Sequence, residues 1–379
     1  MSVTNIPEKV KIRLWGKAAG RCEYEGCNEP LWLDSLTKAE FNTAYIAHII
    51  ADSPDGPRGD PIYSEQLKAE ISNLMLMCDK HHRLIDKEDV AGHTIERLQA
   101  MKAAHEQRIE VVSSIDADKK SHILLYGANI GVHTSPLSLS EAALAMSPDR
   151  YPADAHPLSI GLKNSSFEDH SVTFWTIEDD HLRNMVIQQV RPRLKANEIS
   201  HLSVFAIAPQ PLLILLGSLL SDIPAAEVYQ RHREPSSWKW ETKPNDFQFI
   251  VSEPNEITGP PVLVFSLSAS ITNDRLFVRM GKGITVWRVT IPSPHNDFLK
   301  SRQQAQAFRQ QIRTLMDHIK LRHGENEIIH VFPAMPVCLA VEFGRLLMPK
   351  ADLPLRIYDE NKAKGGFVHA LDINLPKRN

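Results

Sequence analysis

The feature that most constrains the fold is an internal repeat in the second half of the chain. Residues 204–220 (VFAIAPQPLLILLGSLL) align without a gap with residues 331–347 (VFPAMPVCLAVEFGRLL). The coincident pairs are Val204/Val331, Phe205/Phe332, Pro209/Pro336, Leu212/Leu339, Gly217/Gly344, Leu219/Leu346 and Leu220/Leu347. Apolar residues coincide by chance in many such alignments, whereas matched Phe, Pro and Gly at fixed spacing favour a duplication. We therefore expect two similar structural units.

Each copy of the repeat reads as an apolar strand followed by an apolar helix. Two further apolar stretches, HILLYGANIG and PVLVFSLSA, precede the copies, and each leads into a turn of small residues. Strands that alternate with helices predict a parallel α/β architecture. We expect two fused halves, about residues 121–255 and 256–379, with a pseudo-twofold crevice for a ligand at the carboxyl ends of their strands.

Residues 1–118 follow a different pattern. The stretch from Pro7 to Gly20 has helical periodicity, with Pro at the first turn and Gly at the stop. The β-rich run TAYIAHII, the polar loop DSPDGPRGD, the apolar run LMLM and the stretch DKHHRLID follow. Their order predicts strand, long loop, strand and helix, hence an α+β domain. A helix over about 94–115 then ends at the polar stretch DADKKSH, where we place the domain boundary.

Three of the four cysteines lie in the first eighty residues, beside several histidines. Cys22 and Cys27 form one pair, and Cys78 with His81 forms a second pair. Two such pairs supply the four ligands of a closed tetrahedral zinc site, which could hold a domain with a small core. The alternative is two ordinary thiols near a histidine, which the knuckle spacing of both pairs disfavours. Cys338 lies in the apolar stretch PVCLAVEF and is expected to be a small core residue.

Between and beside these pairs lie His48, Asn73 and His82, each at the expected end or start of an element. The stretches GRCEYEGCNEPL, AHII and NLMLMCDKHHRLID resemble the HNH endonuclease family, a ββα-metal fold. The resemblance implies a metal-dependent endodeoxyribonuclease with His48 as general base, His82 as a ligand of a catalytic divalent ion such as Mg²⁺, and Asn73 orienting one of them. Many members carry an acidic metal ligand where this chain has Ala47.

Asp86 lies one helical turn after His82 and could replace that missing ligand. The alternative reading of Asp86 is an ordinary solvated acid on a helix. The catalytic metal shell is therefore the part of the nuclease prediction that depends most on the structure.

The stretch VFPAMPVCLAVEFGRLLMPKADLPLRIYD, with SLSA and SSWKW before it, resembles the SAVED domain, a fusion of two CARF-like Rossmann halves. The order HNH then SAVED is similar to nuclease effectors of the CBASS antiphage systems of bacteria. In those effectors a cyclic oligonucleotide from a partner cyclase binds SAVED, drives oligomerisation and starts destruction of double-stranded DNA. The resemblance therefore implies a homo-oligomer, dimeric or larger on activation, that causes abortive infection. Because two similar halves most simply match two bases, we expect a cyclic dinucleotide.

The residues that would hold this nucleotide are predicted from residue type and position. Two flat rings around a cation could stack bases and bind phosphate, and turns of small polar residues let a ligand approach the backbone. For the rings and strand residues, burial in the core is the alternative. The candidates are Tyr126, Asn129, Trp238, Lys239, Trp240, Ser268, Pro333 and Lys350.

Charge and composition set the remaining expectations. Acidic residues outnumber basic ones in residues 1–118, although the whole chain carries a net charge of only −3. An acidic nuclease domain should bind DNA weakly as a single copy, which favours control by assembly. No apolar run reaches the length of a membrane span, and the start of the sequence has charges where a secretory signal would need apolar residues. We expect a cytoplasmic protein.

Two other functions remain open at this point. In the first, the carboxyl-terminal domain reads DNA, as in a restriction or modification-dependent HNH nuclease, and should carry a basic face. In the second, Ala47 marks lost catalysis and the zinc unit only holds the fold of a binding protein. Substitution of His48 would then change no cleavage activity.

Overall fold

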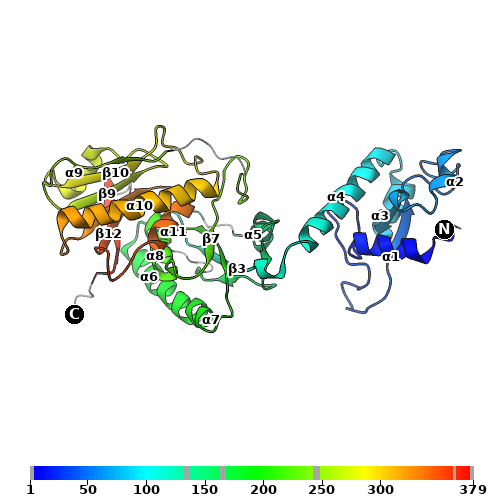
Figure 1. Ribbon diagram of the computed structural model, residues 1–379, viewed down its shortest axis with the longest axis horizontal. Coiled ribbons are helices and arrows are strands. Elements are labelled where there is room, and N and C mark those ends of the chain that lie inside the picture. Colours follow the sequence, from blue (N-terminus) through cyan, green and yellow to red (C-terminus); the bar gives the residue numbers. More distant parts are fainter. Residues whose placement is uncertain are drawn as a thin grey trace. The chain divides into compact units, whose positions relative to one another are not determined.

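The computed structural model describes residues 4–131, 133, 137–162, 165, 167–241, 248–361 and 364–375 of the chain. The chain forms two compact units, Met1–Asp116 and Ala117–Asn379, which we call unit 1 and unit 2. In Figure 1 unit 1 runs from blue to cyan and unit 2 from blue-green to red. Each unit has its own core and is described by itself.

Unit 1 is organised around a two-stranded antiparallel ribbon. Strands β1 and β2 pair so that His48 lies opposite Leu74, and helix α3 follows β2 directly. Leu14 of α1, Leu76 of β2 and Leu98 of α4 are fully buried in one apolar cluster. The elements are α1 (Glu8–Lys17), β1 (Tyr45–His48), α2 (Tyr63–Leu67), the 3₁₀ turn η1 (Ile71–Asn73), β2 (Leu74–Met77), α3 (Asp79–Arg83), the π-helical turn η2 (Leu84–Glu88) and α4 (Ile95–Ser113).

Unit 2 contains two sheets with matching parallel centres. In one sheet β3, β6 and β7 are neighbours in that order, and in the other sheet β9, β11 and β12 are neighbours. All four pairings between these neighbours are parallel. Strands β6 and β11 carry the two copies of the repeat. The α/β architecture predicted from the sequence is therefore confirmed, with corresponding strands in two halves.

The remaining elements of unit 2 surround these strands. Strand β8 lies before residue 255, the predicted boundary of the halves, but it pairs antiparallel with β10 of the second sheet. Three residues carry too little periodicity for such an edge strand to be predicted. The first-sheet elements are η3 (Ala117–Lys119), β3 (Lys120–Gly127), α5 (Leu139–Met146), β4 (Tyr151–Pro152), β5 (Leu158–Ser159), α6 (Val172–Met185), η4 (Val186–Val190), α7 (Arg191–Lys195), β6 (Leu202–Ile207), α8 (Gln210–Leu220) and β7 (Ala226–Val228). The second-sheet elements are β8 (Ile250–Ser252), β9 (Pro261–Ser266), α9 (Asn273–Met280), β10 (Thr285–Thr290), α10 (Arg302–His323), β11 (Ile329–Ala334), α11 (Val337–Arg345), β12 (Leu355–Asn361) and β13 (Gly366–Ile373).

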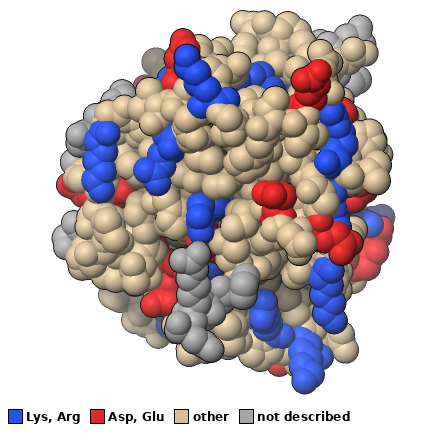
Figure 2. Space-filling model, turned by 90° about the vertical axis from the view of Figure 1, so that its left-hand side faces the viewer, with Lys and Arg blue, Asp and Glu red and all other residues tan. Residues whose placement is uncertain are grey.

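The described helices and the face of the molecule shown in Figure 2 bear on the predictions about a membrane span and a basic face. Among the described residues, no helix combines the length and the apolar character needed to cross a bilayer. On the face shown in Figure 2, basic and acidic side chains are interspersed, and neither sign gathers into a single patch.

The two halves of unit 2 meet along helices α8 and α11. Gly217 and Gly344, which coincide in the repeat, lie against each other. A Cβ built on Gly217 would lie 2.0 Å from the carbonyl oxygen of Val341, and a Cβ on Gly344 would lie 2.0 Å from that of Ile214. Because Ile214 and Val341 are also repeat partners, the contact has pseudo-twofold symmetry. Only glycine allows the two helix backbones to approach this closely.

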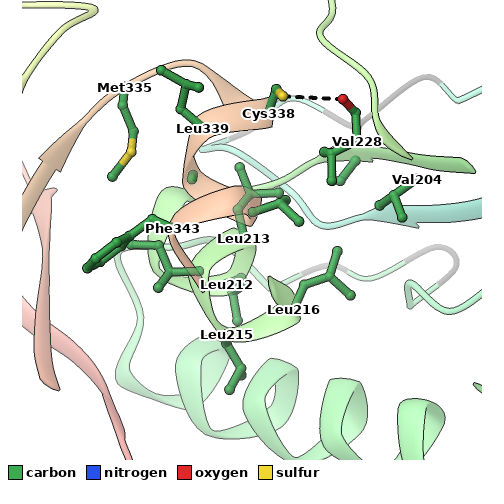
Figure 3. Close-up of a cluster of buried hydrophobic side chains, with 14 of the residues drawn as sticks. Val204, Leu212, Leu213, Leu215, Leu216, Val228, Met335, Cys338, Leu339 and Phe343 are labelled. Atoms are coloured by element: carbon green, nitrogen blue, oxygen red, sulfur yellow. Dashed lines mark hydrogen bonds between the residues drawn. The ribbon is translucent and has the colours of Figure 1, made fainter. Parts of the chain in front are cut away.

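Around this crossing the side chains form one apolar core (Figure 3). Leu212 and Leu216 of α8 lie near Leu339 and Phe343 of α11, and all four are fully buried. Cys338, expected to be a core residue, is 1% exposed, and its thiol donates a hydrogen bond of 3.2 Å to the carbonyl of Val228. Close packing of helix on helix thus fixes the two halves of unit 2 relative to each other.

Candidate functional site

The four predicted zinc ligands converge in unit 1. The Sγ atoms of Cys22, Cys27 and Cys78 and a ring nitrogen of His81 all lie within 4.8 Å of one another. The Nδ1 atom of His81 is 3.7 Å from Sγ of Cys22 and 3.2 Å from Sγ of Cys78. Three sulfurs and one imidazole nitrogen at such separations match the donor set of a closed tetrahedral zinc site.

Local backbone geometry explains why these donors meet. Gly26 has a φ of +78° and Asn28 a φ of +55°, and these left-handed residues turn the chain back after Cys22. The backbone N–H of Cys22 donates to the carbonyl of Glu29 at 2.9 Å, which closes this turn. On the other side, Cys78 precedes α3 and places His81 on its first turn. The two pairs therefore come from a tight turn and a helix start.

The surroundings of the cluster are apolar and aromatic. Tyr24 stacks on the ring of His81, with 4.1 Å between ring centroids and 2° between planes. Burial raises the pKa of the Cys22 and Cys78 thiols and lowers the pKa of His81. A neutral imidazole is the ligand form of histidine, and a bound cation would draw the thiols into their thiolate form. The residues present therefore fit a soft divalent ion such as zinc.

His48 lies at the end of β1 and is only 7% exposed. Its Nε2 is 2.9 Å from the carbonyl oxygen of Lys68. Because a carbonyl only accepts, Nε2 must carry the proton in this contact. A neutral His48 then holds its lone pair on Nδ1, which is the form that a general base requires.

Asn73 acts on the backbone that follows His48. Its Oδ1 accepts from the N–H of Ile50 at 2.7 Å, and its Nδ2 donates to the carbonyl of Ile50 at 2.8 Å. Nδ2 also lies 3.3 Å from the carbonyl of Leu67. Asn73 is 4% exposed, so each of these bonds replaces one to water. It fixes the chain two residues beyond His48, and its amide contacts among the described residues go to Ile50 and Leu67 and not to the His48 ring.

His82 is held by an acid and an aromatic ring. Its Nε2 lies 3.3 Å from Oδ2 of Asp86, and Tyr45 of β1 stacks on its ring at 4.9 Å between centroids. Asp86 also accepts from Nη2 of Arg58 at 2.7 Å. Burial raises the pKa of Asp86, but the hydrogen bonds from His82 and Arg58 outweigh it and leave that pKa lowered. Both oxygens of Asp86 thus have protein partners, while Ala47 is buried in the apolar core.

Arg58 is the functional candidate that the sequence did not indicate. Its side chain is 6% exposed, and one of its guanidinium nitrogens also lies 3.3 Å from the carbonyl of His48. It comes from a polar loop between β1 and α2, where a charged residue normally faces water. Only the folded arrangement reveals that it joins the surroundings of His48 and His82.

A cavity of about 430 Å³ lies at the carboxyl ends of the strands in unit 2. The segments that line it follow β6, β7, β9 and β11, as the sequence predicted for a ligand crevice. Pro209 and Pro336, which coincide in the repeat, both lie on its wall. Its size is that of an ordinary small-molecule site.

Two glutamines from the first half reach into the second half at this cavity. Oε1 of Gln210 accepts from the N–H of Met335 at 3.1 Å, and Oε1 of Gln230 accepts from the N–H of Cys338 at 3.2 Å. The N–H of Cys338 in the first turn of α11 and that of Met335 just before the helix are therefore already engaged by protein. These bonds couple the two halves at the cavity wall.

The cavity wall carries both signs of charge. Arg231 and Arg233 supply the basic side chains, and Asp169, Asp359 and Glu360 the acidic ones. Burial and the nearby Asp169 raise the pKa of Asp359 to about 7. Asp359 therefore takes up a proton more readily than an exposed aspartate does. The wall can therefore bind phosphates on one part and hydrogen-bond donors on another.

Of the residues predicted to hold a nucleotide, only Ser268 lines this cavity. Tyr126, Trp238 and Trp240 are 0%, 2% and 7% exposed and belong to the apolar core of unit 2. Their faces pack on other side chains, as in the edge-on contact of Trp238 with Phe205.

The other predicted residues lie elsewhere. Asn129 donates to the carbonyls of Ser165 and Phe167 at 2.8 and 3.1 Å and so holds a loop. Pro333 is buried within β11, and Lys239 and Lys350 are exposed away from the described cavity lining. The sequence missed Gln230, because a lone glutamine after a short strand gives no motif.

Comparisons with known proteins identify the larger unit. A family model described as the SMODS-associated and fused to various effectors sensor domain (SAVED) matches residues 182–373, half of the chain. No curated protein matches the chain significantly.

Among solved structures, the Acinetobacter baumannii Cap4 SAVED/CARF-domain receptor with the cyclic trinucleotide 2′3′3′-cAAA is 11% identical, with a TM-score of 0.43, and the match covers 82% of this chain and 61% of that chain. The Moraxella osloensis Cap4 receptor is 10% identical, with a TM-score of 0.39 and coverage of 74% and 60%. The chain thus spans about three fifths of the length of these receptors. The family model alone carries the assignment: this chain belongs to the SAVED family.

Proposed function

We propose that this chain is a metal-dependent HNH DNA endonuclease that a cyclic oligonucleotide activates through its SAVED domain, in a CBASS-type antiphage defence. The observation that carries the proposal is the grouping of His48, Asn73 and His82 around an antiparallel ribbon and its following helix, next to a three-cysteine, one-histidine cluster. A SAVED domain lies in the same chain. The modification-dependent alternative needs a basic face on the sensor, whereas the face shown in Figure 2 carries interspersed basic and acidic side chains.

The chemistry at the proposed nuclease centre follows from its hydrogen bonds. His48, with its Nε2–H held by Lys68, takes a proton from the attacking water at Nδ1. His82 would be the protein ligand of a divalent ion, which would stabilise the charge on the phosphate and the leaving 3′ oxygen. Asn73 keeps the backbone after His48 in place. In the same unit Cys22, Cys27, Cys78 and His81 would hold a structural zinc ion.

The proposed sensor site is the cavity between the two halves of unit 2. Arg231 and Arg233 supply the positive charge that the phosphates of a cyclic nucleotide need. The Acinetobacter baumannii Cap4 receptor has been solved with the cyclic trinucleotides 2′3′3′-cAAA and 3′3′3′-cAAA. For this chain we favour a cyclic dinucleotide. The repeat partners Pro209 and Pro336 both line the cavity, and two similar walls suit a cyclic ligand with two similar halves.

Assembly would connect the sensor to the nuclease. Residues 1–118 have more acidic than basic side chains, so a single copy has little attraction for double-stranded DNA. A homo-oligomer presents several nuclease units to one duplex and gains affinity through multivalency. Ligand binding in the cavity would stabilise that oligomer.

The test is plasmid cleavage by the purified chain with Mg²⁺ and a panel of cyclic di- and trinucleotides. We expect a cyclic dinucleotide to start cutting and to increase the mass of the particle in solution. His48→Ala should abolish cutting, whereas His156→Ala, a change at an exposed histidine of unit 2, should not. Cutting that is equally fast without any cyclic nucleotide would refute the sensor, and cutting by the His48→Ala variant would refute the assigned base.

A further inference from the structure

We propose that Arg58 is a positioning residue of the nuclease centre, which orients the imidazole of His82 for a divalent ion by holding Asp86. The inference rests on the proposed nuclease function and extends it to a residue outside the His-Asn-His set. It also assigns Asp86 a different role from the metal ligand suggested by its sequence position.

Arg58 makes more directed contacts than a surface arginine. Its Nε donates to the carbonyl of Ile49 at 2.8 Å, and its Nη1 donates to the carbonyl of Ile85 at 2.6 Å. Its Nη2 lies 2.7 Å from Oδ1 of Asp86 and 3.3 Å from the carbonyl of His48. The planar guanidinium thereby joins the end of β1 to the π-helical turn after α3.

Asp86 divides its two oxygens between two partners. Oδ1 faces Arg58, and Oδ2 lies 3.3 Å from Nε2 of His82. An ionised carboxylate only accepts hydrogen bonds, so this contact places the imidazole proton on Nε2. A neutral His82 then presents Nδ1 as the lone pair for a metal ion. The arrangement is the one by which carboxylates fix the tautomer and the orientation of metal-binding histidines.

The ring of His82 is fixed in a second direction by Tyr45. This residue lies on β1 and stacks on the imidazole with 15° between the planes. Asp86 holds the edge of the ring and Tyr45 holds its face. Since Arg58 fixes Asp86, loss of the guanidinium should free rotation of the His82 ring while leaving the cysteine cluster intact, because the described contacts of Arg58 reach none of its four donors.

The experiment measures metal binding directly, without DNA. Ni²⁺ suits imidazole ligands, and its heat of binding to the zinc-loaded chain is followed by calorimetry. The part that disappears in His82→Ala identifies the site. Removal of such an outer partner typically weakens metal affinity about 10- to 100-fold, and we expect this loss for Arg58→Ala and for Asp86→Asn. Mg²⁺ half-saturation of plasmid cleavage should rise in parallel.

Two further variants separate positioning from a structural role. Arg58→Lys keeps a cation beside Asp86 but cannot reach all the carbonyls, so it should lower the melting temperature and keep Ni²⁺ affinity within about threefold. Arg83→Ala breaks an exposed pair with Asp79 on the same helix and should change neither quantity. Zinc content serves as the control for folding of unit 1, because the proposed zinc site forms only in the folded unit. If Arg58→Ala loses its zinc, the Ni²⁺ affinity of Asp86→Asn decides the test.

The outcomes are distinct from those of the proposed function. Unchanged Ni²⁺ affinity in both Arg58→Ala and Asp86→Asn would overturn the positioning role, even if both variants melt earlier. A wild-type chain that never cuts DNA under any cyclic nucleotide would refute the proposed nuclease, whatever the calorimetry shows.

Discussion

Different kinds of interaction stabilise the interiors of the two units of this chain. In unit 1 a small apolar cluster is supplemented by a four-donor Cys/His cluster and by buried polar side chains, Asn73 and Arg58, that bind the backbone. In unit 2 two helices meet through paired glycines inside a large apolar core. A small apolar cluster contributes less stability than a large one, so directed bonds and the proposed zinc ion would add to it in unit 1. Its candidate catalytic side chains lie among those directed bonds.

The largest effect should follow from loss of the cysteine cluster. Structural zinc contributes about 10–16 kcal/mol to small zinc domains, more than the whole stability of most domains. We expect Cys22→Ser to lose the metal and to unfold unit 1, while unit 2 keeps a cooperative melting transition. Metal analysis and calorimetric melting measure both.

Cys338→Ala is the matched control for that change, because it removes the cysteine of the unit 2 core. It should keep the full zinc content and lower the stability of unit 2 by about 1 kcal/mol. Retention of zinc and of two melting transitions in Cys22→Ser would contradict the contrast between the units.

A smaller but still large effect is expected at the helix crossing of unit 2. Gly344→Ala places a methyl group against the backbone of α8, which cannot move aside as a side chain could. Overpacking of this kind costs about 3 kcal/mol or more, and the free energy of unfolding of unit 2 should fall by that amount. Gly217→Ala should behave alike because the contact is reciprocal.

Gly283→Ala serves as the control for the glycine variants, since a Cβ there meets nothing within 4 Å. Denaturant unfolding of the three variants measures the difference. Equal stability of Gly344→Ala and Gly283→Ala would show that the helices can separate without cost, and packing would then not be what holds unit 2 together.

The smallest effect concerns a polar group in the unit that otherwise relies on packing. Glu178 of α6 is 1% exposed, and among the described residues neither carboxylate oxygen has a hydrogen-bond partner. Burial raises its pKa to about 7. Since the folded pKa lies above the unfolded value, the contribution of Glu178 to stability is fully present below about pH 4.5 and is lost as pH rises to about 7.

Glu178→Gln removes this proton linkage. Relative to the parent, the variant should gain about 2 to 3 kcal/mol of stability as pH rises from 5 to 8, because most of the shift from 4.5 to about 7 takes effect in that range and one pKa unit corresponds to about 1.4 kcal/mol. Thermal unfolding of both proteins across that range measures the difference in their free energy of unfolding. The contributions of all other titrating groups are the same in both proteins and cancel. A difference that stays constant with pH would contradict the assignment.

Patterns that repeat along the chain were predictable, and contacts between distant side chains were not. The repeat at 204–220 and 331–347 predicted the strands β6 and β11, their helices and the crevice at the strand ends. The spacing of Cys22, Cys27, Cys78 and His81 predicted that their donors would meet. The first signal is a repeat and the second is the short spacing within each Cys/His pair, and both can be recognised in the sequence without a structure.

The missed residues share a physical reason. Arg58 is buried because carbonyls and Asp86 from two segments surround it, the end of β1 and the turn after α3, and neither contact follows from a local sequence motif. Trp238 and Trp240 looked like stacking surfaces, but large apolar rings gain more from burial in a nearby core. The charge or aromatic character of a loop residue does not by itself determine whether its side chain is exposed to water or buried.

The glycine contact between α8 and α11 also affects how this chain can change over generations. Each glycine is constrained by the backbone of the other, so a mutation at Gly217 cannot be compensated by any side chain at position 344. Elsewhere the two copies of the repeat differ, as Pro211 opposite Cys338 illustrates. The reciprocal constraint on Gly217 and Gly344 predicts that only glycine is tolerated at these two positions, which keeps the pseudo-twofold symmetry at the point where the halves meet.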